Sequence, residues 1–299
     1  MVSAATVASR LAEGRALYDN GRHTQLVARL PDLLAAAHQR AEAAAGPAMW
    51  ATVASCYELA THALSKLGRH ESSRLTADRA MTYARLSESA VAVALSSRAL
   101  SIVLRHQGRP HLAQRVNLDA LTEVEATGLA TPAQRTVFVQ MLCSTAYAAA
   151  QSGDKDRALE LTGEADRALR LLPEQPDHPA TPVNATALTP AQVHLYKVGM
   201  HWSLGDSASA LDAARSLHPA QFPTAERRGR LFTDVARAWW QHDRPEQTAT
   251  TLLAAYRQAS AEVVDRPAIR KIATDLIDRH PRVVGVRELR AILRPNRTH

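Results

Sequence analysis

The sequence predicts an all-α protein, a solenoid of tetratricopeptide-like helical hairpins wound into a right-handed superhelix. Six short polar turns recur along the 299 residues, each between two segments rich in Ala and Leu. The turns are centred on Gly21, Gly68, Gly108, Gly153, Gly205 and Asp243, at intervals of 38 to 52 residues. Periods of this length are typical of stacked helical hairpins. Few segments alternate apolar and polar residues with period two, so we expect no β-sheet.

Residue types recur at set offsets from each turn. Seven residues before it the side chain is small or medium, as at Gly14 and Ala146, which allows the two helices of a hairpin to pack closely. Alanine is found at the fifth residue after three turns and the twelfth after four: Ala113, Ala158, Ala210, Ala80, Ala120, Ala165 and Ala255. Glycine at the turn accepts the left-handed conformation that ends a helix tightly. The period exceeds the usual length of about 34 residues, which indicates lengthened, degenerate tetratricopeptide units.

Two segments depart from the repeat. Residues 172–190 hold five prolines and no helical period, which predicts a long loop that is either a binding loop or lid, or a tolerated insertion. Residues 265–293 predict two helices that cap the open end of the stack. Asp265 is expected to be the N-cap of the first, with Pro267 in its first turn. Residues 1–299 are therefore expected to form one domain of about six hairpins.

Composition and motifs favour a binding protein over an enzyme. The net charge of +7 is spread without blocks, which fits a solvated helical surface or contact with acidic partners. The chain has no nucleophile elbow, P-loop, dinucleotide fingerprint or zinc-protease motif. The histidine pairs His194/His201 and His106/His111 lack the spacing of a zinc site, so neither metal nor cofactor is expected.

Cysteine usage and hydropathy indicate the cell compartment. Cys56 and Cys143 each lie inside an apolar helical pattern, and we expect both to be buried reduced thiols. The sequence shows no signal peptide and no long apolar run. We therefore expect a cytoplasmic protein that does not contact the membrane.

The turns also set a register for the concave face, which the first helix of each tetratricopeptide hairpin lines. Counting three, six, ten and thirteen residues back from each turn places arginine and aromatic side chains there, and Tyr196 is one residue out of register. The candidate ligand-binding residues are Arg15, Tyr18, His62, Arg98, Arg105, Tyr147, Gln192, Tyr196, Trp202, Arg230, Arg237 and Trp240. Guanidinium groups pair with carboxylate or phosphate, and aromatic rings cover an apolar body. The alternative is that these arginines are solvated or paired within their own repeats.

The C-terminal part resembles a known family. Three stretches carry the likeness: ALTPAQVHLYKVGMHWSLGD, FPTAERRGRLFTDVARAWWQHDRPEQTATTLLAAYRQAS and RPAIRKIATDLIDRHPRVVGVREL. They resemble the tetratricopeptide-like C-terminal region of actinobacterial (Streptomyces-type) Xre/Cro helix-turn-helix transcriptional regulators. The likeness is good from Gln192 to Leu289 and rests on repeat pattern alone from Arg10 to Leu169. It implies a region that senses a ligand or partner and dimerises, behind a DNA-binding head.

The chain departs from this family at its start. The first repeat begins almost at Met1, which leaves no room for a helix-turn-helix. We therefore expect either a truncated regulator or a stand-alone sensor or adaptor. DNA would be reached only through a missing or separate helix-turn-helix, and a homodimer fits the resemblance.

Together these observations predict a regulatory module linked to transcriptional control, which binds a small molecule, a peptide or a protein partner on its concave face. One alternative is a stand-alone protein–protein interaction scaffold. A helical-repeat enzyme ranks last, because acidic candidates on the inner face are scarce beyond Glu58. The segment ERRGR, with Arg227, Arg228 and Arg230, offers a weaker nucleic-acid alternative.

Overall fold

The computed structural model describes residues 2–170, 172 and 188–294. Over these residues the chain is an all-α solenoid of helical hairpins without a β-strand, which confirms the predicted fold class. The six hairpins are α1 (Ala4–Asp19) with α2 (His23–Ala43), α3 (Pro47–Lys66) with α4 (His70–Leu86), α5 (Ala90–His106) with α6 (Pro110–Glu125), α7 (Pro132–Gln151) with α8 (Lys155–Leu169), α9 (Pro190–Ser203) with α10 (Ser207–Ala214), and α11 (Ala225–Gln241) with α12 (Pro245–Gln258). The 3₁₀ turn η1 (Pro219–Gln221) precedes α11, and α13 (Ala261–Val264), α14 (Pro267–Arg279) and α15 (Val286–Leu293) follow α12.

Local chemistry ends and restarts each helix as the repeat pattern predicts. All six turn residues, Asp243 included, have positive φ, between 53° and 82°. This left-handed conformation stops the first helix of each hairpin and lets the second return beside it. Thr131 and Thr189 form capping boxes at the starts of α7 and α9, with a proline at the first position of each helix.

Small residues hold the hairpins together. The seven alanines that recur at the fifth and twelfth positions after the turns are all buried, with at most 2% of their surface exposed. An alanine at a helix crossing brings the backbones close and costs no side-chain entropy. The repeat pattern therefore marks the contacts on which the stack is built.

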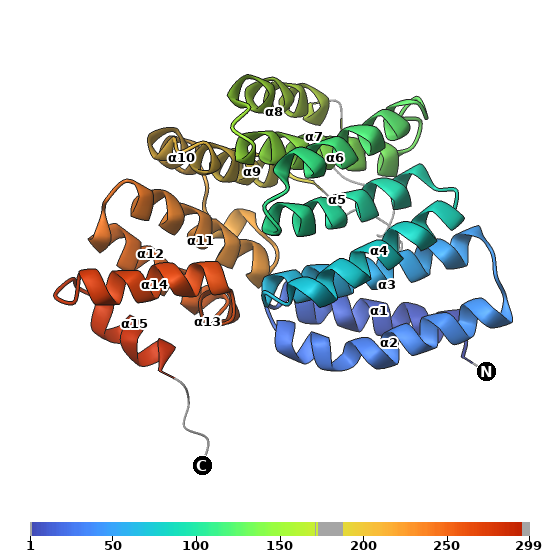
Figure 1. Ribbon diagram of the computed structural model, residues 1–299, viewed down its shortest axis with the longest axis horizontal. Helices are drawn as coiled ribbons and strands as arrows, with labels where there is room; N and C mark the ends of the chain where they lie inside the picture. The colour runs from blue at the N-terminus through green and yellow to red at the C-terminus, as the bar shows by residue number, and fades with distance from the viewer. Residues whose placement is uncertain (1, 171, 173–187, 295–299) are drawn as a thin grey trace, which may run out of the picture.

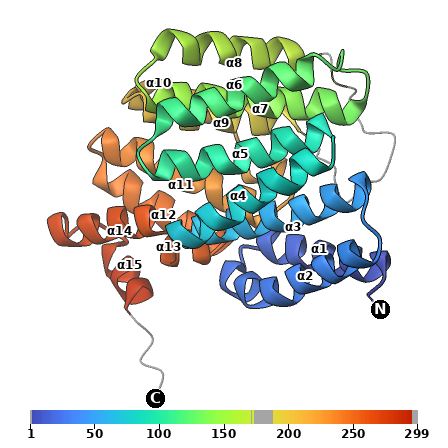
Figure 2. The ribbon, with the colours of Figure 1, turned by 45° about the vertical axis from the view of Figure 1, so that its right-hand side comes forward.

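The stack curves until its two ends meet, as Figure 1 shows. Helix α1 packs against α11, and the first two interhelical turns lie against C-terminal segments. A Cβ atom added to Gly21 would lie 3.2 Å from Cβ of Ala259, and one on Gly68 would lie 2.6 Å from Cγ of Pro267. We call this junction, where α1–α4 meet α11, α13 and α14, the seam. In Figure 2 the hairpins from α3 to α8 stack side by side and lead away from the seam.

The C-terminal end departs from expectation in one detail. Helices α14 and α15 are present within residues 265–293, but Asp265 is not the N-cap of α14. Asp265 is instead the C-cap of the short helix α13, and Arg266 occupies the N-cap position without a side-chain capping bond. The corner is held by the Arg266 side chain, which donates to Glu262 and Thr233.

The predicted loop over residues 172–190 lies mostly outside the described residues. Of its positions, the structure describes only 172 and 188–190. Across the described part of the chain, no helix combines the length and the apolar character needed to cross a membrane.

Candidate ligand-binding cavity

A cavity of about 610 Å³ lies inside the ring. Its wall comes mainly from the first helices of the hairpins, α1, α3, α5, α7, α9 and α11, and from the start of α14. Eleven of the twelve candidate residues line it: Arg15, Tyr18, His62, Arg98, Arg105, Tyr147, Gln192, Tyr196, Trp202, Arg230 and Arg237. The volume is within the range of about 300–1,000 Å³ that is typical of small-molecule sites.

Trp240 is the one candidate that does not line the cavity. It packs against the apolar cluster formed by α11, α12, α14 and α15, and its ring stands edge-on to His280. The guanidinium of Arg279 lies 5.8 Å from the centre of the Trp240 ring. In the sixth hairpin the position three residues before the turn faces the capping helices, because α14 covers that side of α11.

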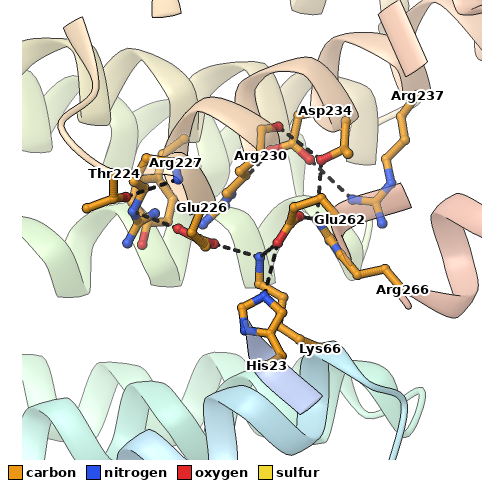
Figure 3. Close-up of polar contacts among 12 residues, drawn as sticks. His23, Lys66, Thr224, Glu226, Arg227, Arg230, Asp234, Arg237, Glu262 and Arg266 are labelled. Carbon is orange, nitrogen blue, oxygen red and sulfur yellow. Dashed lines mark hydrogen bonds and ion pairs between the residues drawn. The ribbon is translucent and has the colours of Figure 1, made fainter. Parts of the chain in front are cut away.

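Buried ion pairs join the two ends of the ring at the seam (Figure 3). Lys66 of α3 contacts Glu226 of α11, at 2.6 Å, and also Glu262 of α13. Glu262 is fully buried and contacts His23 and Arg266 as well. The contacts of Lys66 and His23 with these carboxylates link residues 160 to 239 positions apart in the sequence.

The two seam carboxylates are held in their charged form. Burial acts to raise the pKa of Glu226 and Glu262, but Lys66 and the neighbouring arginines outweigh it and lower both pKa values. A carboxyl group with a lowered pKa stabilises the folded state above its unfolded pKa, and that stability is lost as the pH falls through the folded pKa. The seam is therefore intact at neutral pH.

The cavity-facing arginines of α11 are also paired. Arg230 and Arg237 both contact Asp234, at 3.3 Å and 3.2 Å, and Figure 3 shows Asp234 between them. The spacing of four and three residues puts all three side chains on one helix face. The guanidinium of Arg237 also covers the ring of Trp202, 4.7 Å from its centre.

The arginines of α5 differ. Arg98 donates a hydrogen bond of 3.2 Å to the hydroxyl of Tyr196, and the guanidinium of Arg105 lies 4.4 Å from the ring centre of Tyr147. Among the described residues, no carboxylate forms a salt bridge with either arginine. The position between them, equivalent in spacing to Asp234, is Ile102, which also lines the cavity.

The pKa of Tyr196 reflects the positive charge of the arginines around it. Burial acts to raise the pKa of its phenol, but Arg98, Arg230 and Arg227 outweigh burial and lower the pKa to about 7. Arg230 lies over the ring, 5.0 Å from its centre. A phenol that ionises near neutral pH shows that this part of the cavity stabilises negative charge.

On the α3 side of the cavity, burial favours neutral side chains. Burial, with Arg98 and other cations nearby, lowers the pKa of His62 to about 3, so its imidazole is neutral at physiological pH. Burial raises the pKa of Glu58, whose carboxylate accepts a 2.6 Å hydrogen bond from Ser96. The positive charge that faces a ligand therefore comes from arginines and Lys66.

The ERRGR segment does not form a separate surface patch. Arg227 and Arg230 line the cavity, while Arg228 donates to the backbone carbonyl groups of Phe222 and Pro223. Arg228 also donates to Gln258. Two of the three arginines thus belong to the same cavity wall as the candidate residues.

The remaining sequence features are placed as follows. Cys56 and Cys143 are both buried free thiols, as expected, and burial raises the pKa of each to about 12. Among the described residues there is no cluster of three or more His, Cys, Asp or Glu side chains that could hold a metal ion.

Several residues of the cavity and seam were not among the candidates. Asp234 could have been found, because it follows Arg230 by four residues and precedes Arg237 by three. The contacts of Lys66 with Glu226 and Glu262 carry no such signal, since they join residues 160 and 196 positions apart. Only the closure of the ring brings them together.

Comparisons with known proteins leave the family open. No family model matches the chain, and no curated protein matches it. The crystal structure of BtubC (BKLC) from P. vanneervenii is similar at 14% sequence identity and a TM-score of 0.49, over 80% of this chain and 91% of that one. The structure of Naa15/Naa10 bound to HypK-THB shares 14% identity at a TM-score of 0.26, over 95% of this chain and 44% of that one. The class of protein is accordingly the one that its own hairpins define, an all-α helical-repeat solenoid.

Proposed function

We propose that this chain is the ligand-sensing module of a transcriptional regulator or adaptor and that it binds an anionic small molecule in its central cavity. The observation that carries this proposal is the cavity wall. Arg98 and Arg105 face a space of about 610 Å³ without a carboxylate partner among the described residues, beside a phenol whose pKa is lowered to about 7. Buried cations with no counter-charge cost free energy, and a bound anion offsets that cost.

The closed ring supports a small ligand over a long peptide. In an open solenoid an extended chain can lie along the whole concave face. Here the seam joins both ends, and the ion pair of Lys66 and Glu226 occupies part of the inner face. The space that remains fits a compact ligand better than an extended peptide.

The link to transcription is supported by the resemblance of residues 192–289 to the C-terminal regions of helix-turn-helix regulators. We expect a helix-turn-helix protein to be encoded either in frame with this gene or directly beside it. In the second case its product should bind this chain. Binding to DNA by this chain alone, with its ring intact, would contradict the assignment.

The ligand assignment is tested by native mass spectrometry on the protein isolated from the organism that encodes it. We expect a retained small molecule in the wild-type protein and reduced occupancy in the Arg98→Ala and Arg237→Ala variants. Arg157→Ala is a matched control, because Arg157 pairs with Glu160 on an exposed face of α8. If both cavity variants retain the small molecule at full occupancy, the cavity is not its binding site. If the chain binds a protein partner and no small molecule raises its thermal stability, the scaffold alternative is favoured.

A further inference from the structure

Two helices present arginines to the cavity with the same spacing but with different surroundings. Arg98 and Arg105 are seven residues apart on α5, and Arg230 and Arg237 are seven apart on α11. On α11 the residue between them is Asp234, which contacts both guanidiniums. On α5 that position is Ile102, so the arginine pair has no built-in counter-charge on its own helix.

Three of these arginines converge on two tyrosines. Arg98 donates to the hydroxyl of Tyr196, Arg230 lies over the ring of the same tyrosine, and Arg105 lies over the ring of Tyr147. Nε of Arg105 is buried and has no hydrogen-bond partner among the described residues. The ring contact of Arg105 uses none of its N–H groups, and the hydrogen bond of Arg98 uses one of its five, so both guanidiniums keep N–H groups that can donate to a ligand.

The charge at this place exceeds what one carboxylate group neutralises. Of the four guanidiniums, those of Arg230 and Arg237 share the carboxylate of Asp234, and the other two form no salt bridge with a described carboxylate. A ligand carboxylate supplies one negative charge, whereas a phosphate monoester carries close to two at neutral pH and has three acceptor oxygens. Arginine binds phosphate through paired N–H donors, so two guanidiniums and a hydroxyl suit this group well.

We propose that Arg98, Arg105 and the hydroxyl of Tyr196 form a subsite for the phosphate group of a small phosphate monoester. This inference rests on the proposed function, since it names the ligand class of the same cavity. The rings of Tyr147 and Trp202, edge to face with centres 6.1 Å apart, lie beside the subsite and cover the organic part of the ligand. A cavity of about 610 Å³ favours a small molecule over a phosphopeptide.

Phenyl phosphate and benzoate are suitable probes because they share an aromatic body and differ in the anionic group. In calorimetric titrations of the full chain we expect phenyl phosphate to bind at least about tenfold more tightly than benzoate. Binding also has an optical signal. A phosphate group beside Arg98 offsets the positive charge that lowers the pKa of Tyr196, so tyrosinate absorbance slightly above pH 7 should fall on binding and be absent in Tyr196→Phe.

The decisive variant is Ile102→Asp, which gives α5 the same central carboxylate that α11 has. Ile102→Asp should weaken phenyl phosphate binding by at least about tenfold and reduce the optical signal. Ile102→Asn introduces a side chain of the same size as Asp but without the charge, and this variant should bind phenyl phosphate nearly as tightly as the wild type does. Circular dichroism checks that both variants fold. If Ile102→Asp does not fold, Arg98→Leu serves as the second variant with the same expected loss.

Three results would overturn the subsite. They are benzoate binding as tightly as phenyl phosphate, phenyl phosphate binding that is unchanged in Ile102→Asp and Arg98→Leu, and binding of a phosphopeptide but of no small phosphate monoester. If mass spectrometry then shows a retained anion of another class, whose occupancy falls in Arg98→Ala, the proposed function holds and only the phosphate assignment fails.

Discussion

The α5 wall of the cavity and the α11 wall at the seam contain the same kinds of side chain for different purposes. On α11 every cavity-facing arginine has a carboxylate partner, and α11 also contributes Glu226 to the ion pairs across the ring. On α5, Arg98 contacts Tyr196 and Arg105 contacts Tyr147, and neither forms a salt bridge with a described carboxylate. The α5 wall lies in the middle of the stack, and the α11 wall lies where its two ends meet.

The difference shows how a helical solenoid can separate stability from binding. A buried arginine with a carboxylate partner contributes to the fold, and removal of either partner leaves an uncompensated charge. A buried arginine without such a partner raises the free energy of the empty protein and lowers it again when an anion binds. We therefore expect substitutions at the seam to change stability, and substitutions on α5 to change ligand binding.

The largest expected effect is at the seam. Glu262→Gln removes the charge that Lys66, Arg266 and His23 share, and we expect it to lower the free energy of unfolding by about 3–5 kcal/mol. Urea unfolding at neutral pH measures this loss. As a control, Asp275→Asn breaks the exposed pair with Lys271 on α14 and should cost no more than about 1 kcal/mol. Equal effects of the two substitutions would show that the seam is not a stabilising junction.

A matched pair of glycines tests the seam through its backbone. Gly108 ends α5 and has no atom within 4 Å of an added Cβ, whereas an added Cβ on Gly68 would lie 2.6 Å from Pro267. Both have positive φ, so Gly108→Ala should cost about 1–2 kcal/mol through backbone strain alone. Gly68→Ala should cost clearly more, because it also pushes α14 away from the seam. Thermal unfolding of both variants decides this, and equal losses would contradict the close contact.

The arginines themselves should differ in their effect on stability. Arg237→Leu removes one of the two partners of buried Asp234 and should lower the free energy of unfolding by about 1.5–3 kcal/mol. Arg105→Leu removes a buried cation with no carboxylate partner in the described structure, so a change below about 1 kcal/mol is expected. Urea unfolding without ligand makes the comparison. If Arg105→Leu lowers the free energy of unfolding more than Arg237→Leu does, the α5 wall, and not the α11 wall, is the one that stabilises the fold.

The last test is a titration of Tyr196. Tyrosinate absorbance should show one group in the wild-type protein that ionises at about pH 7, and Arg98→Leu should move it to higher pH. Because the unfolded phenol keeps its proton to about pH 10, the folded state binds fewer protons in this range. Stability should therefore rise with pH between about 7 and 10, and Arg98→Leu should flatten that rise. A wild-type titration without any group near pH 7 would contradict the charged environment of Tyr196.

Much of the site follows from the sequence, because its register is local. Once Gly108 is recognised as a turn, the helical period places Arg98 and Arg105 on the inner face of the preceding helix. The same count fails at Trp240, since α14 covers that side of α11 and nothing near Trp240 in the sequence predicts this. The N-cap prediction at Asp265 fails for a similar reason, because Arg266 is held by Glu262 and Thr233 instead.

By itself the sequence determined the hairpins, their turns and most of the residues that face inward. These depend on backbone conformation at single residues and on helical periodicity, both of which act over a few positions. Only the tertiary structure decided that the ring closes, that Lys66 meets Glu226 and Glu262, and that Arg98 of α5 reaches Tyr196 of α9. Those contacts depend on the accumulated curvature of the whole stack, and small angles between successive hairpins add up to it without any local signal.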